Sequence, residues 1–227
     1  MLWSVLLFGL LLGVQHALEA DHVAAVAALA TRARSVRGAV SVASWWGIGH
    51  AATLFVFGAI LVALGATLPP ALERAFELAV GLLLVLLGAD VLRRARRRGV
   101  HFHVHEHGPD LRHLHGHSHA GESRHEIHEH RHALPPILVG CVHGLAGSAA
   151  LILLSLRTMR TPAQALLYLA TFGAGTILGM VLFAVLLFVP IRVSARRLER
   201  ASRTFEVAIG AGSLAIGAWV VVRVAAF

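Results

Sequence analysis

Long apolar runs separated by short polar connections dominate this sequence, and they predict membrane-spanning helices. Six runs reach the length of about 20 residues that a helix needs to cross a hydrocarbon core of about 30 Å. Proline stands at several of their ends, where a missing backbone N–H does least harm. The pattern predicts an all-α polytopic membrane protein with six transmembrane helices. These cover residues 2–30, 38–66, 71–92, 134–156, 162–189 and 204–224.

Composition supports the same class. Hydrophobic residues make up 57% of the chain and charged residues only 14%, which is too apolar for a soluble domain of 227 residues. The net charge of +8 comes from arginines at the ends of the apolar runs, and no basic stripe is interleaved with aromatic residues. We therefore expect a lipid bilayer as the surroundings and no nucleic acid as a partner.

The arginines also predict an orientation. They gather in alternate connections, at 32–37, 93–98 and 192–203, whereas the other connections hold few. Cytoplasmic loops carry an excess of arginine and lysine. We expect these three connections on the cytoplasmic side of the cell (inner) membrane and both termini outside.

The two halves of the sequence resemble one another. FELAVG at 76–81 matches FEVAIG at 205–210, and GVQHAL at 13–18 aligns with GCVHGL at 140–145. Three helices per half would invert the second copy, and inverted repeats place a substrate site near the bilayer midplane. The alternative is chance similarity among leucine, alanine and glycine. The predicted units are a first repeat at 1–98, a histidine-rich loop at 99–133 and a second repeat at 134–227.

Polar side chains interrupt the first apolar run near its middle, at His16, Glu19, Asp21 and His22. A carboxylate at the centre of a spanning helix costs about 2.5 to 3.5 kcal/mol on insertion scales, so it requires a polar partner inside the bundle. Imidazoles with carboxylates and no thiolate suit nickel, cobalt or zinc. A single membrane histidine more simply donates a hydrogen bond between helices. We predict a metal site formed by His16, Asp21, His22, His50 and His143, with Glu19 as a further candidate ligand.

Helical geometry sets a condition on this site. At 100° per residue, His16, Glu19 and His22 share an arc of about 120°, whereas Asp21 points about 140° away from His16. Either the helix breaks near residues 18–21, or Asp21 only orients an imidazole. We favour the break, which would also suit the excess length of the first run.

The H-x4-D-H motif of His16, Asp21 and His22, together with Gly49-His50 and HGLAGS at 143–148, resembles the nickel/cobalt transporter superfamily. Six spans with a histidine-rich central loop are similar to its shorter members. The resemblance implies that the motif residues handle metal. It also implies a secondary transporter, with Ni²⁺ or Co²⁺ as transported substrate and no prosthetic group. The superfamily includes uptake and export proteins, so the direction stays open.

The central loop holds 12 of the 16 histidines, between residues 101 and 132. It shows little apolar periodicity, so we expect a disordered cytoplasmic tract that chelates metal weakly and meets a metal donor or acceptor. The alternative is a solvated linker with no role in metal binding. The H-E-x-x-H pattern at 128–132 is accidental in a tract so rich in histidine.

Two other functions compete with metal transport. A thiol-electron carrier built on an inverted repeat would need a cysteine in each half, but Val14 stands where the second half has Cys141. An intramembrane metalloprotease could use the same histidines with Glu19 as base, but no separate protease motif supports it. We therefore expect a transporter and not an enzyme.

Overall fold

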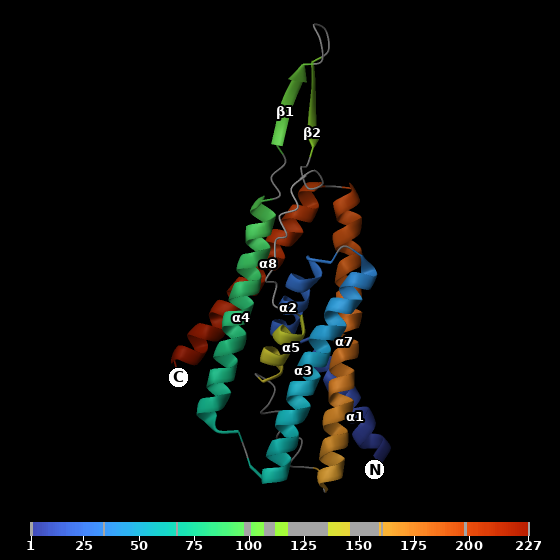
Figure 1. Cartoon of the computed structure of the whole chain (residues 1–227), viewed down its shortest axis with the longest axis vertical. Helices are drawn as coiled ribbons and strands as arrows, with labels where there is room; N and C mark the ends of the chain where they lie inside the picture. Colours follow the sequence, from blue (N-terminus) through green and yellow to red (C-terminus); the bar gives the residue numbers. More distant parts are fainter. Residues whose placement is uncertain are drawn as a thin grey trace.

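The computed structural model of the chain is an elongated helical bundle with a β-hairpin at one end (Figure 1). Both termini lie in the half of the bundle that is farther from the hairpin (Figure 1). The structure describes residues 2–33, 35–66, 68–97, 101–106, 112–117, 136–145, 159, 161–197 and 199–226.

Seven helices and two strands make up the described part of the chain. In order they are α1 (Leu2–His16), α2 (Ala20–Ala30), α3 (Val36–Leu64), α4 (Pro70–Arg97), β1 (His101–Glu106), β2 (Arg112–His117), α5 (Pro136–Gly144), α7 (Pro162–Arg197) and α8 (Glu199–Ala226).

Four helices of the described residues are long and apolar enough to cross a membrane: α3, α4, α7 and α8. The bent pair α1 and α2 makes a fifth candidate span. The protein is thus an all-α multi-pass membrane protein in its membrane part, with four to five candidate spans where the sequence predicted six. The remaining predicted span, at 134–156, contains α5, and its residues 146–156 lie outside the described part.

The first apolar run is broken, which is the favoured one of the two alternatives that the helical geometry left open. α1 ends at His16 and α2 begins at Ala20, and the two axes meet at 64°. Glu19 precedes α2 with extended backbone angles (φ −64°, ψ 151°). The polar residues thus lie at a helix end, where backbone groups without helical partners already need polar surroundings.

Helices cross closely where glycines remove the side chain. A Cβ added to Gly13 of α1 would collide with the carbonyl oxygen of Phe172 on α7. A Cβ added to Gly140 of α5 would collide with the carbonyl oxygen of Trp46 on α3. Small residues let transmembrane backbones approach one another in this way. The contacts fix α1 against α7 and α5 against α3.

α2 is held on a different pair of helices. The hydroxyl of Ser213 on α8 donates a hydrogen bond to the carbonyl oxygen of Ala24 on α2, at 3.1 Å. Beyond the end of α2, Arg32 Nη2 lies 2.7 Å from Asp90 Oδ2 on α4. Asp90 also pairs with Arg93 and Arg94, at 2.9 and 3.0 Å. α2 is therefore anchored to α4 and α8.

A β-hairpin lies within the segment that was expected to be disordered. β1 pairs with β2 in antiparallel register, which sets His101, His103 and His105 opposite His117, His115 and His113. Histidine alternates with Phe102 and Val104 along β1. Alternation of period two is the pattern of a strand, and the composition argument overlooked it. These strands also depart from the all-α expectation.

Candidate metal site

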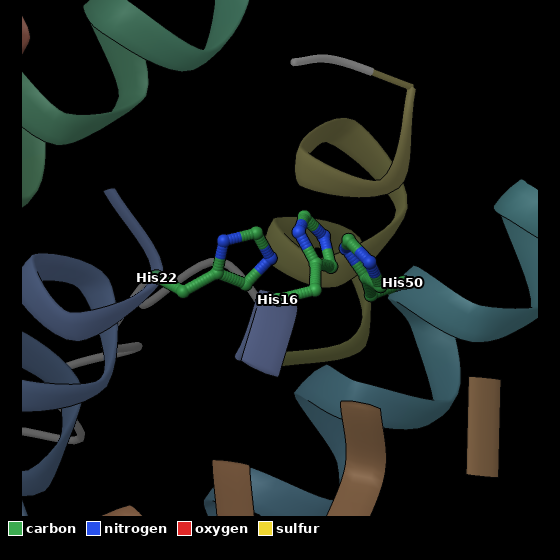
Figure 2. A group of neighbouring side chains, drawn as sticks. All are labelled: His16, His22 and His50. Atoms are coloured by element: carbon green, nitrogen blue, oxygen red, sulfur yellow. The ribbon is translucent and has the colours of Figure 1, made fainter. Parts of the chain in front are cut away.

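Four histidines from four helices converge at the break between α1 and α2. His16 comes from α1, His22 from α2, His50 from α3 and His143 from α5. Their side chains are 0 to 3% exposed. Figure 2 shows three of them, His16, His22 and His50, with their rings gathered at the point where the helices meet.

One group of candidate ligands consists of His16, His22 and His50. Each offers a ring nitrogen, and these nitrogens lie within 4.8 Å of one another. The His22 ring centroid lies 4.2 Å from that of His16 and 5.0 Å from that of His50. With neutral imidazoles, this group carries no net charge and offers only nitrogen ligands.

A second group consists of Asp21, His22 and His143, whose candidate ligand atoms also lie within 4.8 Å of one another. Asp21 Oδ1 lies 3.2 Å from His22 Nδ1, and Asp21 Oδ2 lies 3.2 Å from His143 Nε2. His22 Nδ1 and His143 Nε2 are 3.4 Å apart. This group adds a carboxylate to two imidazoles.

Local backbone geometry positions both groups. Asp21 Oδ1 accepts a hydrogen bond of 2.9 Å from the backbone N–H of His22, which fixes the carboxylate at the start of α2. A Cβ on Gly144 would lie 2.5 Å from the carbonyl oxygen of His50. The close crossing of α5 and α3 at this glycine is what brings His143 to the other ligands.

Several buried nitrogens of the site have no hydrogen-bond partner within the described part of the chain. They are His22 Nε2, both ring nitrogens of His50, and His143 Nδ1. A buried polar atom without a partner costs about 1 to 3 kcal/mol. A cation or water held between these atoms would offset that cost. The donor set suits a borderline divalent metal.

The structure brings together all five residues that the sequence proposed: His16, Asp21, His22, His50 and His143. Glu19 lies at the margin. Its side chain is 45% exposed, and its Oε1 lies 3.1 Å from His16 Nδ1. Glu19 belongs to neither group of three among the described residues. Its contact with His16 suits a residue that orients this imidazole.

Sequence analysis overlooked Trp46. This side chain is fully buried on α3. Its ring centroid lies 5.8 Å from that of His22 and 5.5 Å from that of His143. Trp46 precedes His50 by four residues, and residues four apart share a helix face. That spacing could have identified Trp46 as a wall of the site.

Comparison with known proteins gives the family. Residues 4–212 match the family described as "Cytochrome C biogenesis protein transmembrane region". The chain belongs to this family. It is also 33% identical over 201 residues to the urease accessory protein UreH of Bacillus sp. (strain TB-90), an alignment that covers 87% of this chain and 82% of that protein. No solved structure matches.

The family match corrects the resemblance inferred from the motifs, because the chain is not placed in the nickel/cobalt transporter superfamily. H-x4-D-H spans seven residues, from His16 to His22, whereas the family match extends over residues 4–212. A short motif reflects the local chemistry of imidazoles and a carboxylate beside a helix break. It does not determine the ancestry of the whole membrane part.

Proposed function

We propose that this chain is a secondary transporter of divalent transition-metal ions, with Ni²⁺ as the first cargo to test and Co²⁺ as the second. The observation that carries the proposal is the buried cluster of four imidazoles and one carboxylate at the break between α1 and α2. Its nitrogen and oxygen donors suit these ions. The metal is the transported substrate, and we propose no prosthetic group.

The position of the cluster suits transport. Its ligands come from α1, α2, α3 and α5, so a movement of one helix relative to the others changes the set of donors around an ion. Interrupted helices provide substrate sites of this kind in secondary transporters, where one part of the bundle rocks against the other.

We further propose that the two halves form a 3+3 inverted repeat. The repeat aligns Gly13 with Gly140, and it also aligns WGIGH at 46–50 with FGAGT at 172–176, so that Trp46 corresponds to Phe172. The Cβ of Gly13 would meet the carbonyl oxygen of Phe172, and the Cβ of Gly140 would meet that of Trp46. The first helix of each half therefore crosses the second helix of the other half at corresponding positions, as a twofold relation requires.

The third helices of the two halves support the same relation. A Cβ on Gly217 of α8 would lie 2.7 Å from the carbonyl oxygen of Gly81 on α4. A Cβ on Gly88 of α4 would likewise lie 2.7 Å from the carbonyl oxygen of Gly210 on α8. The repeat aligns Gly81 with Gly210 and Gly88 with Gly217, so the crossing maps onto itself.

We propose nickel as the first ion to test because of the similarity to UreH. UreH is named a urease accessory protein, and urease requires nickel. That name also favours an accessory role over an enzymatic one, which argues against the metalloprotease alternative. We propose that the hairpin end faces the cytoplasm. The end of α4 that leads to β1 lies there (Figure 1), and its last two turns hold Arg93 and Arg94, which share Asp90 with Arg32.

The family description favours a second candidate, a role in cytochrome c biogenesis through thiol-electron transfer. A carrier that cycles an intrachain disulfide needs two cysteines, and the sequence contains one, Cys141. Val14 occupies the position aligned with it. We therefore rank metal transport first, and a Cys141→Ser variant that retains full activity would dispose of the thiol mechanism.

The test is a transport assay with radioactive nickel. Vesicles that contain the purified protein should exchange ⁶³Ni²⁺ across the membrane at an initial rate well above that of empty vesicles. A His22→Gln variant should lose this rate, and Leu18→Ala serves as the matched control because Leu18 lies at the same break and is 55% exposed. Equal rates for His22→Gln and the wild type would refute the proposed site.

A further inference from the structure

His22 belongs to both groups of candidate ligands, and the two nitrogens of its ring have different neighbours. Its Nδ1 lies 3.2 Å from Asp21 Oδ1 and 3.4 Å from His143 Nε2. Its Nε2 has no hydrogen-bond partner among the described residues. Figure 2 shows this ring edge of His22 turned toward His16. The imidazole therefore lies between the two groups.

The two ring edges cannot serve one ion position. Metal–nitrogen bonds are about 2.1 Å long, so ions bound at opposite nitrogens of one imidazole would lie roughly 6 Å apart. A neutral imidazole also has only one nitrogen with a free lone pair, because the other carries the proton. His22 in its neutral form can thus bind an ion on one side or on the other, but not on both together.

We infer that the cluster consists of two coordination sites in series, and that His22 passes a single divalent metal ion from one to the other. Site A is His16, His22 and His50; site B is Asp21, His22 and His143. The inference rests on the proposed transport function for the direction of use, but the two sites themselves can be detected by binding alone.

The two sites differ in chemistry. Site A offers three imidazole nitrogens, and site B offers two imidazoles and a carboxylate. When the ion is in site A, His22 ligates through Nε2, and its Nδ1–H can donate to Asp21 Oδ1. When the ion moves to site B, Nδ1 releases this proton to become the ligand, and Nε2 takes up one proton in exchange, so the imidazole stays neutral. A carboxylate that accepts this hydrogen bond holds the ring in place for the metal. Asp21 is thus an orienting residue for site A and a ligand in site B.

The contacts of the helices attach His22 to a different part of the bundle from the other three imidazoles. His16 lies on α1, which packs on α7 at Gly13. His50 and His143 lie on α3 and α5, which cross at Gly140. His22 lies on α2, which is tied to α8 through Ser213. A shift of α2 relative to the other helices would move His22 from the donors of one site toward those of the other.

The test measures Co²⁺ binding to the purified full chain in detergent, by equilibrium dialysis and by visible absorption of the bound ion. The wild type should bind one ion per chain. His50→Gln removes a ligand of site A alone, and His143→Gln removes a ligand of site B alone. Each variant should still bind one ion, with an affinity lowered by no more than about tenfold. The two absorption spectra should differ, because only His50→Gln retains the site with the carboxylate of Asp21.

The double variant His50→Gln/His143→Gln and the single variant His22→Gln disable both sites, so each should lower the affinity by at least a hundredfold. Ile48→Ala and Val142→Ala are the matched controls, because these neighbours on α3 and α5 are 41% and 37% exposed and belong to neither ligand group. Gel filtration and melting temperature show whether each variant is folded. Any variant that fails this check is replaced by the corresponding asparagine substitution.

One shared site would give a different result. Either His50→Gln or His143→Gln would then abolish binding by itself, or both would bind Co²⁺ with the same spectrum, and each of these outcomes would overturn the inference. Failure of the transport proposal is separately visible. In that case the two variants would bind with distinct spectra, but vesicles with the wild-type protein would not move Co²⁺ or Ni²⁺.

Discussion

Asp21 connects two helices of the bundle through its two carboxylate oxygens. Oδ1 accepts a hydrogen bond of 2.9 Å from the backbone N–H of His22, and Oδ2 lies 3.2 Å from His143 Nε2 on α5. Its side chain is 25% exposed. At the scale of single residues, this carboxylate supplies the formal negative charge that the buried imidazoles lack.

Replacement of Asp21 by asparagine keeps the shape and removes the charge. We expect Asp21→Asn to lower the initial rate of ⁶³Ni²⁺ transport by about 10 to 100-fold, the usual effect of losing a carboxylate that binds or orients a metal ligand. The amount of protein in the membrane should not change. Glu73→Gln in the first turn of α4 is the control. A wild-type rate in Asp21→Asn would exclude this carboxylate from the pathway.

Glu19 should matter less than Asp21. It is 45% exposed and contacts His16 Nδ1 at 3.1 Å, so solvent screens its charge and water can replace it. We expect Glu19→Gln to reduce the transport rate less than tenfold and to leave Co²⁺ binding intact. Complete loss of binding in this variant would instead make Glu19 a direct ligand.

Close helix crossings determine the distances within the site at the scale of the elements. Gly140 and Gly144 on α5 lie against the backbone of α3 around Trp46 and His50. An added methyl group must push these backbones apart, and strain of this kind typically costs 1 to 3 kcal/mol. Such a shift would separate His143 from His50, although neither glycine is itself a ligand.

The variant Gly140→Ala tests this dependence. A Cβ there would lie 2.9 Å from the backbone nitrogen of His50, so we expect a lower melting temperature in detergent and a loss of metal affinity. Gly212→Ala on α8 is the control, because nothing lies within 4 Å of a Cβ at that position. If both variants behave alike, the crossing of α5 and α3 does not position the site.

At the scale of the whole molecule, the strands β1 and β2 lie apart from the candidate metal site (Figure 1). The register of the hairpin sets three histidine positions of β1 opposite three of β2, and alternate strand positions share one face. The hairpin follows α4, which ends at Arg97. The transport pathway itself is proposed to lie within the helices.

Removal of residues 101–132 should therefore leave transport measurable. We expect the deletion to change the metal concentration for half-maximal transport or the retention of metal after entry, because the segment would collect or buffer ions at its own side. Initial rates measured in both directions in vesicles distinguish these effects. Complete loss of transport in a correctly inserted deletion would place an essential ligand in the loop.

The orientation can be tested with one introduced cysteine. In a Cys141→Ser background, Ser118→Cys should react with a membrane-impermeant maleimide only after the cells are opened, because we propose that the loop faces the cytoplasm. Labelling in intact cells would reverse the orientation. The parent Cys141→Ser protein controls for background reaction.

Sequence by itself determined the membrane class and the place of the helix break. Apolar length and composition are local properties, so they identified the long helices α3, α4, α7 and α8 without any contact information. The angular spacing of His16, Glu19 and Asp21 favoured a break over an orienting role for Asp21 on a straight helix, and the structure has a break between His16 and Ala20. The set of candidate ligands was also predicted from the sequence, since buried polar residues in an apolar run are rare and costly.

Only the tertiary structure decided how the five candidate ligands are divided into two groups. Distances between helices depend on glycine crossings such as those at Gly13 and Gly140, which bring together positions more than a hundred residues apart. Linear spacing contains no information on which ring edge of His22 faces His16 and which faces His143. It likewise gave no sign that Trp46 walls the site. The division into two ligand groups arises from three-dimensional packing, because a shared imidazole can separate two sites only when donors from different helices lie on its opposite edges.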